Sequence, residues 1–119
     1  MAKKAKQGKY QCSVDVTVAL IGGKWKPTIL FHLLKEKKRF GELKRLVVGV
    51  TERVLTMQLR ELEEDQLITR KAYPEIPPRV EYQLSKQGQS LVDILEQMAQ
   101  WGEKYMRMQD TKLKNSLTK

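Results

Sequence analysis

The segment from residue 51 to residue 65 contains four side chains of types that can contact nucleic-acid bases, and they recur at spacings of three and four residues. These side chains are Arg53, Thr56, Met57 and Arg60. In a helix, such spacings place them on one face and leave a leucine row at positions 55, 59 and 62 for the core. Arginine can pair bidentately with guanine, threonine can bond a base edge, and methionine offers apolar contact. The face therefore has the chemistry to read DNA bases; a solvated helix side, suggested by the acidic run that ends the segment, is the alternative.

Cys12 is the only cysteine of the chain and the second residue with distinctive chemistry. A single cysteine excludes an internal disulfide framework and a cysteine-based zinc site. Cys12 lies near Lys9 at the start of an expected helix, and a basic neighbour and a helix N-terminus both favour a reactive thiolate. Free cysteines are usually small buried hydrophobes. Two interpretations therefore stay open, a redox-sensing thiol and a packed side chain.

No catalytic or metal-binding set accompanies these residues. His32 is the only histidine and lies in a leucine-rich segment, where a structural role is the simpler interpretation. The sequence has no phosphate-cradling glycine loop and no nucleophile with a matched base. Trp25 and Trp101 hold apolar helix positions, so we expect them in packing rather than in a ligand cage. The sequence predicts no enzyme activity, no cofactor and no metal.

The basic charge of the chain is concentrated in a patterned segment as well as at its ends. The formal net charge is +9 and the isoelectric point is about 9.7. Residues 24–45 hold eight basic and two acidic side chains. Such an excess indicates an anionic partner, and we expect five residues of the segment to contact DNA phosphates. They are Lys24, Lys26, Arg39, Lys44 and Arg45.

The length of 119 residues predicts one domain with one modest core. No apolar run approaches the roughly 20 residues of a membrane span, and the lysine-rich start lacks the apolar stretch of a signal peptide. We therefore expect a cytoplasmic protein with no membrane partner.

Hydrophobic periodicity predicts three short helices ahead of the base-contacting segment. The first begins near Ser13 and stops at Gly22-Gly23. The second begins at Pro27 and ends at the charged run 35–39, and the third covers about 41–47. Thr51 is expected to cap the next helix and to lie at the DNA-binding surface.

Two extended segments follow, and they are expected to pair as a two-stranded antiparallel ribbon. They cover residues 67–73 and 80–84, and the second alternates apolar and polar side chains. Between them, YPEIPPR holds three of the four prolines. Proline restricts the backbone, so the tip forms a stiff finger that loses little entropy on docking. Lys71, Pro78 and Arg79 are expected at the DNA, with Arg79 reaching a phosphate or the minor groove.

The last helix is expected to be long and to begin at Ser85 as its cap. About 24 residues of helix span about 36 Å, more than a core of this size can cover, so a second subunit is expected to cover the remainder. The predicted interface combines apolar positions of the first and last helices. They are Val14, Val18, Leu91, Leu95, Met98, Trp101 and Tyr105.

Four blocks along the chain resemble, in order and spacing, the HxlR family of bacterial transcription regulators. They are IGGKWKPTILFHLL, RFGELKRL, VTERVLTMQLRELEEDQLITR and YPEIPPRVEYQLS, and the match spans about Cys12 to Trp101. The resemblance implies a dimeric winged helix-turn-helix related to the MarR group, which binds operator DNA and represses or activates neighbouring genes. It also implies that the helix from Thr51 to Asp65 is the recognition helix and that Tyr73 to Arg79 form the wing.

The same resemblance gives Cys12 a role. The family commonly places one cysteine just before its first helix, and in several members this thiol senses oxidants or electrophiles. Cys12 matches that position, while Ser13 stands where the family often has proline.

The sequence thus predicts a mainly α winged helix-turn-helix with a small β-ribbon, dimerising through its N- and C-terminal helices. The domain is expected over residues 12–108, with flexible basic tails at 1–11 and 109–119. We expect a homodimer that binds double-stranded, pseudo-palindromic operator DNA and regulates transcription, with a small electrophile acting at Cys12. The alternative is a basic architectural protein that binds DNA or RNA without sequence preference, and such a protein would bind unrelated duplexes equally.

Overall fold

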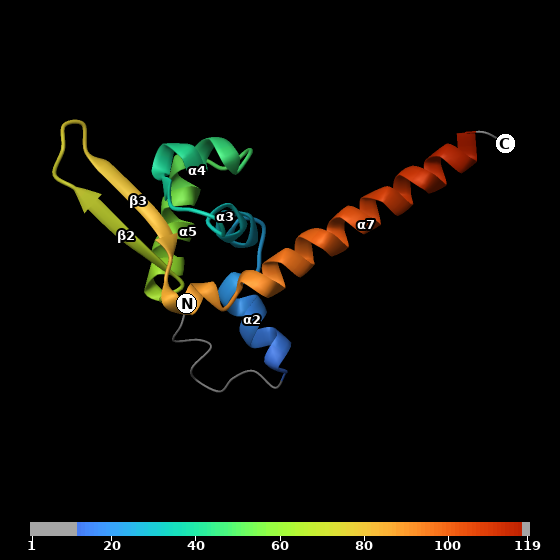
Figure 1. The fold of residues 1–119 in the computed structure, drawn as a ribbon, viewed down its shortest axis with the longest axis horizontal. Helices are drawn as coiled ribbons and strands as arrows, with labels where there is room; N and C mark the ends of the chain where they lie inside the picture. The colour runs from blue at the N-terminus through green and yellow to red at the C-terminus, as the bar shows by residue number, and fades with distance from the viewer. Residues whose placement is uncertain (1–11, 118–119) are drawn as a thin grey trace.

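The computed structural model describes residues 12–117. The described chain forms a small helical body with a three-stranded sheet at one end, and the last helix projects from the opposite side (Figure 1). This is a mainly helical winged helix-turn-helix architecture, as the sequence predicts.

Two short helices open the described chain. Helix α2 (Ser13–Ile21) ends at Gly22, whose N–H donates to the Val18 carbonyl over 2.7 Å. A Cβ at this position would collide with the same carbonyl oxygen, so the helix stop requires glycine. Helix α3 (Lys26–His32) carries Pro27 in its first turn, where the missing backbone donor is tolerated.

The helix-turn-helix unit consists of α4 (Phe40–Leu46) and α5 (Glu52–Glu64). Thr51 caps α5, because its Oγ1 accepts a hydrogen bond from the Val54 N–H over 3.1 Å. Gly49 in the connecting turn has a φ of +90°, which glycine adopts without steric cost. The predicted cap and turn are confirmed.

The sheet has three strands rather than the predicted two. β2 (Ile68–Tyr73) and β3 (Arg79–Leu84) form the expected antiparallel hairpin, and β1 (Lys38–Arg39) pairs with the other edge of β3. The register joins Lys38 to Tyr82. The sequence did not reveal β1 because two charged residues carry no alternation, so this strand depends on its partner.

Ser85 caps a different helix from the one predicted. Its Oγ accepts from the Gly88 N–H over 2.9 Å and closes the four-residue helix α6 (Lys86–Gln89). The chain then turns at Ser90 before α7 (Val92–Leu117) begins. The apolar spacing after Ser85 predicted one helix, whereas the chain breaks between α6 and α7. Helix α7 continues through residues 109–117, where a tail was expected, and the expected tail at 1–11 lies outside the described residues.

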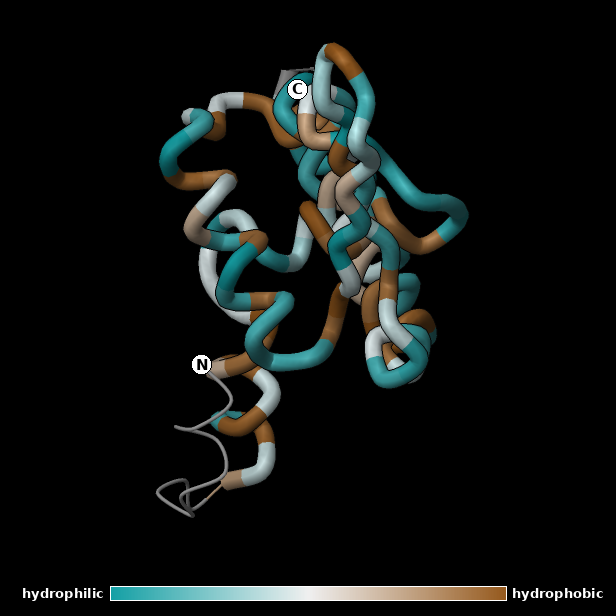
Figure 2. Tube along the Cα trace, turned by 90° about the vertical axis from the view of Figure 1, so that its left-hand side faces the viewer, coloured by the Kyte–Doolittle hydropathy of each residue, from teal (hydrophilic) through white to brown (hydrophobic). Residues whose placement is uncertain are grey.

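One core joins these elements. It contains side chains from α2, α3, α4, α5, the sheet and the start of α7. Hydrophobic and hydrophilic residues alternate along the tube in Figure 2, as expected when each helix buries only one face. In the described part of the chain, no helix is long and apolar enough to cross a membrane. The core fixes α5 beside the β2–β3 hairpin, which is called the wing from here on, and leaves the outer face of α5 in solvent.

Candidate DNA-binding surface

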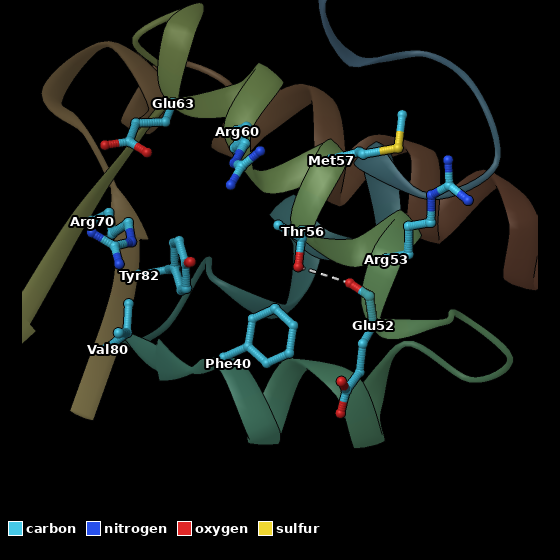
Figure 3. Close-up of a pocket in the computed structure, with 10 residues that line it drawn as sticks. All are labelled: Phe40, Glu52, Arg53, Thr56, Met57, Arg60, Glu63, Arg70, Val80 and Tyr82. Carbon is cyan, nitrogen blue, oxygen red and sulfur yellow. Dashed lines mark hydrogen bonds between the residues drawn. The ribbon is translucent and has the colours of Figure 1, made fainter. Parts of the chain in front are cut away.

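A groove lies between α5 and the sheet, with α4 at its lower edge (Figure 3). Its volume is about 1020 Å³. The four base-contacting residues predicted from the sequence all line it, together with residues from α4 and the strands. The full lining is Phe40, Glu52, Arg53, Thr56, Met57, Arg60, Glu63, Arg70, Val80 and Tyr82.

The recognition face, defined as Arg53, Thr56, Met57 and Arg60, lies along α5 at this groove (Figure 3). Both arginines and Met57 are exposed, and Thr56 is half-buried. The Thr56 hydroxyl donates to the Glu52 carbonyl over 2.8 Å, so its oxygen remains an acceptor. Packing of the leucine row of α5 into the core holds this face outward.

Sequence reasoning missed Arg70. This exposed β2 residue faces the groove from the side opposite α5 (Figure 3). The signal that could have found it is the two-residue period of a strand, which separates Arg70 from Lys71. Glu52 and Glu63 also line the groove. Their negative charges would repel a phosphate group near either end of α5.

Four of the five predicted phosphate contacts are accessible. Arg39 and Arg45 are exposed and border a second hollow of about 530 Å³ beside α4. Lys44 is half-buried on the same helix. Lys24 is exposed, with its Nζ 4.7 Å from the centroid of the Trp25 ring. These residues remain candidates for the DNA backbone.

Lys26 is not accessible, which corrects its assignment as a phosphate contact. Its relative exposure is 7%, and its Nζ lies 2.6 Å from Glu61 Oε1 on α5. Asp65, the C-cap residue of α5, is also buried, and this burial raises the pKa of its carboxyl group. Lys26 instead neutralises acidic side chains where α3 packs on α5.

Arg79 is engaged within the wing rather than free for DNA. Its guanidinium lies 3.9 Å from the centroid of the Tyr73 ring and 3.0 Å from Glu75 Oε2, and Glu81 Oε2 is 3.8 Å away. Lys71 also lies over the Tyr73 ring, at 5.0 Å. Lys71 is exposed and Arg79 half-buried. The residue expected to reach DNA thus braces the base of the wing.

The wing base also holds a perturbed carboxylate. Lys37 Nζ lies 3.1 Å from Glu81 Oε1, and this hydrogen bond lowers the pKa of Glu81, with smaller contributions in the same direction from Tyr73 and Arg79. Pro78 at the tip is exposed. The two carboxylates at the base of the wing are therefore paired with cations, and the outer end is rich in proline.

Apolar side chains remain exposed on α2 and α7. Trp101 is 67% exposed and stacks on Tyr105, with ring centroids 5.4 Å apart and an interplanar angle of 13°. Leu95 is only 2% exposed and Leu91 packs against the core, so both belong to their own subunit, which corrects their assignment to an interface. The predicted interface positions that stay exposed are Val14, Val18, Met98, Trp101 and Tyr105.

Cys12 lies immediately before α2, with an exposed, free thiol. It occupies the N-cap position of α2, and its side chain makes no capping hydrogen bond. His32, on α3, is half-buried, and burial lowers its pKa. Within residues 12–117, no group of three or more His, Cys, Asp or Glu side chains could hold a metal ion.

Comparisons with known proteins agree on one family. The family model described as HxlR-like helix-turn-helix matches residues 20–110. The protein MalR of Fusobacterium mortiferum is 48% identical over 99 residues, which are 82% of this chain and 93% of MalR. The HTH-type transcriptional regulator YtcD of Bacillus subtilis is 53% identical over 94 residues, covering 79% of this chain and 75% of YtcD.

Solved structures give the same result. The redox regulator HypR in its reduced form superposes with a TM-score of 0.78 at 42% identity, covering 84% of this chain and 99% of HypR. Its oxidised form gives a TM-score of 0.75 at 46% identity, covering 78% and 96%. With its helix-turn-helix unit and this degree of similarity, the chain belongs to the HxlR-like helix-turn-helix family of transcriptional regulators.

Proposed function

We propose that the protein is a homodimeric, sequence-specific regulator of transcription that reads operator DNA with α5. The observation that carries the proposal is the recognition face, which lies exposed along a groove between α5 and the wing. An α-helix fits the major groove of B-DNA, and its N-terminal part makes most base contacts. Arg53 and Thr56 lie in that part of α5, and the acidic residues follow at its far end.

The basic surface supplies the binding energy that does not depend on sequence. Arg39, Lys44 and Arg45 lie on or beside α4, next to the groove. Their positive charge would release counterions from the phosphate backbone. Acting on chromosomal DNA, the protein would function in the bacterial cytoplasm.

Dimerisation is proposed through α2 and α7. Several large apolar side chains on these helices face solvent in the single chain, and exposed apolar patches of this kind mark interaction sites. A two-fold dimer would place two copies of α5 in successive major grooves about 34 Å apart. The operator would then be a pseudo-palindrome with half-sites about 10 bp apart, or a multiple of this.

Cys12 is proposed to make DNA binding responsive to oxidants or electrophiles. Its thiol is exposed beside α2, one of the two helices assigned to the dimer. In a disulfide between subunits, two Cys12 thiols would lose two protons and two electrons to the oxidant and form one Sγ–Sγ bond. A bridge or an adduct there would shift α2 against α7 and change the separation of the recognition helices. The similarity to a regulator solved in reduced and oxidised forms supports this assignment.

The competing function is non-specific binding by a basic surface, favoured by the net charge of +9. Fluorescence anisotropy separates the two functions. The reduced protein is titrated onto labelled duplex from its own upstream intergenic region and onto a shuffled duplex, across a series of NaCl concentrations. Tighter binding to the first duplex is the expected result, and equal binding to the two, with steep salt dependence, would support the non-specific function.

A further inference from the structure

We propose that Ile76, at the tip of the wing, is an apolar wedge that enters the DNA minor groove and selects a flexible base step. This inference rests on the proposed function, because it assumes that α5 occupies the adjacent major groove. It assigns a contact that neither the recognition face nor the phosphate-binding residues provide.

The exposure of Ile76 is the first observation. Its relative exposure is 102%, the highest among the exposed large hydrophobic residues of the described chain. Single exposed apolar side chains are common on protein surfaces, so exposure alone decides nothing. The position of Ile76 is what indicates a contact, because Ile76 lies at the outer end of the β2–β3 hairpin, the part of the wing furthest from the helical body (Figure 1).

The tip is also built to hold Ile76 in place. Pro74, Pro77 and Pro78 surround it, and each proline fixes its own φ. Inside the loop, the Glu75 N–H donates to the Tyr73 carbonyl over 2.8 Å. At the base, Arg79 is stacked on Tyr73 and paired with Glu75. An apolar side chain on such a support loses little conformational entropy when it docks.

The charge of the tip excludes a simple phosphate anchor. Between Tyr73 and Arg79, the charged side chains are Glu75 and Arg79, which lie 3.0 Å apart and neutralise each other. No charged side chain of this segment is therefore free to neutralise a phosphate. The chemistry left at the tip is apolar. Isoleucine and proline are among the residues that minor-groove proteins insert between base steps.

The dimensions of the wing suit this contact. A six-residue strand such as β2 spans about 20 Å. Half a turn of B-DNA, which separates a major groove from the neighbouring minor groove on one side of the duplex, is about 17 Å. The groove beside α5 continues onto the wing through Arg70, Val80 and Tyr82 (Figure 3). With α5 in the major groove, the hairpin is long enough to bring Ile76 to the minor groove.

An apolar wedge selects DNA by how easily a base step deforms, and not by the hydrogen-bonding groups of the bases. Pyrimidine–purine steps such as TA and CA/TG unstack most easily. We therefore expect a preference for such a step under the wing, at a position where the recognition face makes no contact. The preference should depend on the size of residue 76 and not on ionic strength, since no charge is involved.

The test uses a duplex that wild-type protein itself selects from a random-sequence pool. 2-Aminopurine is placed in turn at each adenine near the predicted minor-groove site, where unstacking increases its fluorescence. Wild-type protein should brighten the probe at one step in each half-site, and Ile76→Ala should abolish the brightening and weaken binding about tenfold. Ile76→Leu should retain both the brightening and the affinity of the wild type. The slope of log K against log NaCl should be the same for all three proteins.

Thr69→Ala is the matched control, because it truncates another exposed β-branched side chain of the same hairpin, at the end of β2 away from the tip and outside the lining of the groove. It should leave brightening and affinity unchanged. Equal brightening and affinity for wild type and Ile76→Ala, or no brightening by wild type on a duplex that it binds specifically, would overturn the wedge. Failure of the pool to yield any preferred sequence would instead overturn the proposed function.

Discussion

Lys26 on α3 contacts Glu61 on α5, with Nζ and Oε1 2.6 Å apart, and thereby joins α3 to α5. The side chain of Lys26 is 8% exposed and that of Glu61 34%. Burying an ammonium group without a partner is costly, and so is leaving acidic side chains at a helix C-terminus without a nearby cation. This ion pair therefore helps to set where α5 lies against α3.

Replacing Lys26 with methionine should destabilise the protein without removing a DNA contact. We expect the free energy of unfolding to fall by about 2 kcal/mol, at the low end for a buried pair because Glu61 is partly solvated. Urea denaturation measures this change. Lys24→Met removes the same charge from an exposed position and should change stability by less than about 0.5 kcal/mol. A normal stability of Lys26→Met together with a reduced salt slope of DNA binding would restore Lys26 as a phosphate contact.

Local sequence predicted the elements whose signals are local. The cap at Thr51, the turn at Gly49 and the hairpin β2–β3 are confirmed because each depends on residues a few positions apart. Strand β1 depends on pairing with a strand more than forty residues later along the chain. The break before α7 depends on Gly88 packing against the Leu67 carbonyl, which periodicity cannot reveal.

The sequence predicted which residues form the recognition face, but not which basic residues form ion pairs within the protein. The recognition face follows from helical spacing, so its four residues lie together as predicted. Lysine and arginine side chains, however, have different roles at different positions. Lys26 is buried against Glu61, and Arg79 is held by Tyr73 and Glu75, because the fold brings acidic or aromatic groups to them. Charge counting along a sequence cannot separate such cations from those that remain exposed at the surface.

Arg53→Ala and Arg60→Ala should each weaken specific DNA binding and relax base preference. The loss should be about 1 to 3 kcal/mol on the selected duplex and smaller on unrelated DNA, because a bidentate base contact is lost. Lys44→Ala should weaken binding to all sequences alike. Arg107→Ala on α7 removes the same charge away from the groove and is the control. Anisotropy titrations on specific and shuffled duplexes measure all four variants; equal losses on both duplexes for the arginines would refute base reading.

Acidification should loosen the wing through Glu81. The hydrogen bond from Lys37 lowers the pKa of this carboxyl below its ordinary value of 4.5. Because the folded-state pKa is lowered, the contribution to stability is present above the ordinary pKa and is lost as pH falls through the lowered one. Glu81→Gln should therefore reduce the melting temperature at pH 7, and its difference from wild type should shrink near pH 3. A difference that stays constant between the two pH values would show that the effect is not electrostatic.

Trp101→Ala should weaken the proposed dimer. The exposed indole stacks on Tyr105 and presents a large apolar surface, and such aromatic anchors cost about 2 kcal/mol or more on truncation, or roughly thirtyfold in dissociation constant. Sedimentation velocity across a concentration series measures this shift. Glu103→Ala is the control, since a residue two positions along a helix faces nearly the opposite way. Unchanged sedimentation of Trp101→Ala would place the dimer interface elsewhere.

Cys12→Ser should keep DNA binding and lose the response to oxidants. Serine is a favourable N-cap, and the Cys12 side chain makes no capping bond, so α2 should be no less stable in the variant. Diamide should change the affinity of the wild type for the selected duplex and leave Cys12→Ser unaffected, as measured by anisotropy before and after treatment. Because Cys12 is the only cysteine, a disulfide-linked dimer on non-reducing gels must join two copies of it. A diamide response that persists in Cys12→Ser would show that another group transmits the signal.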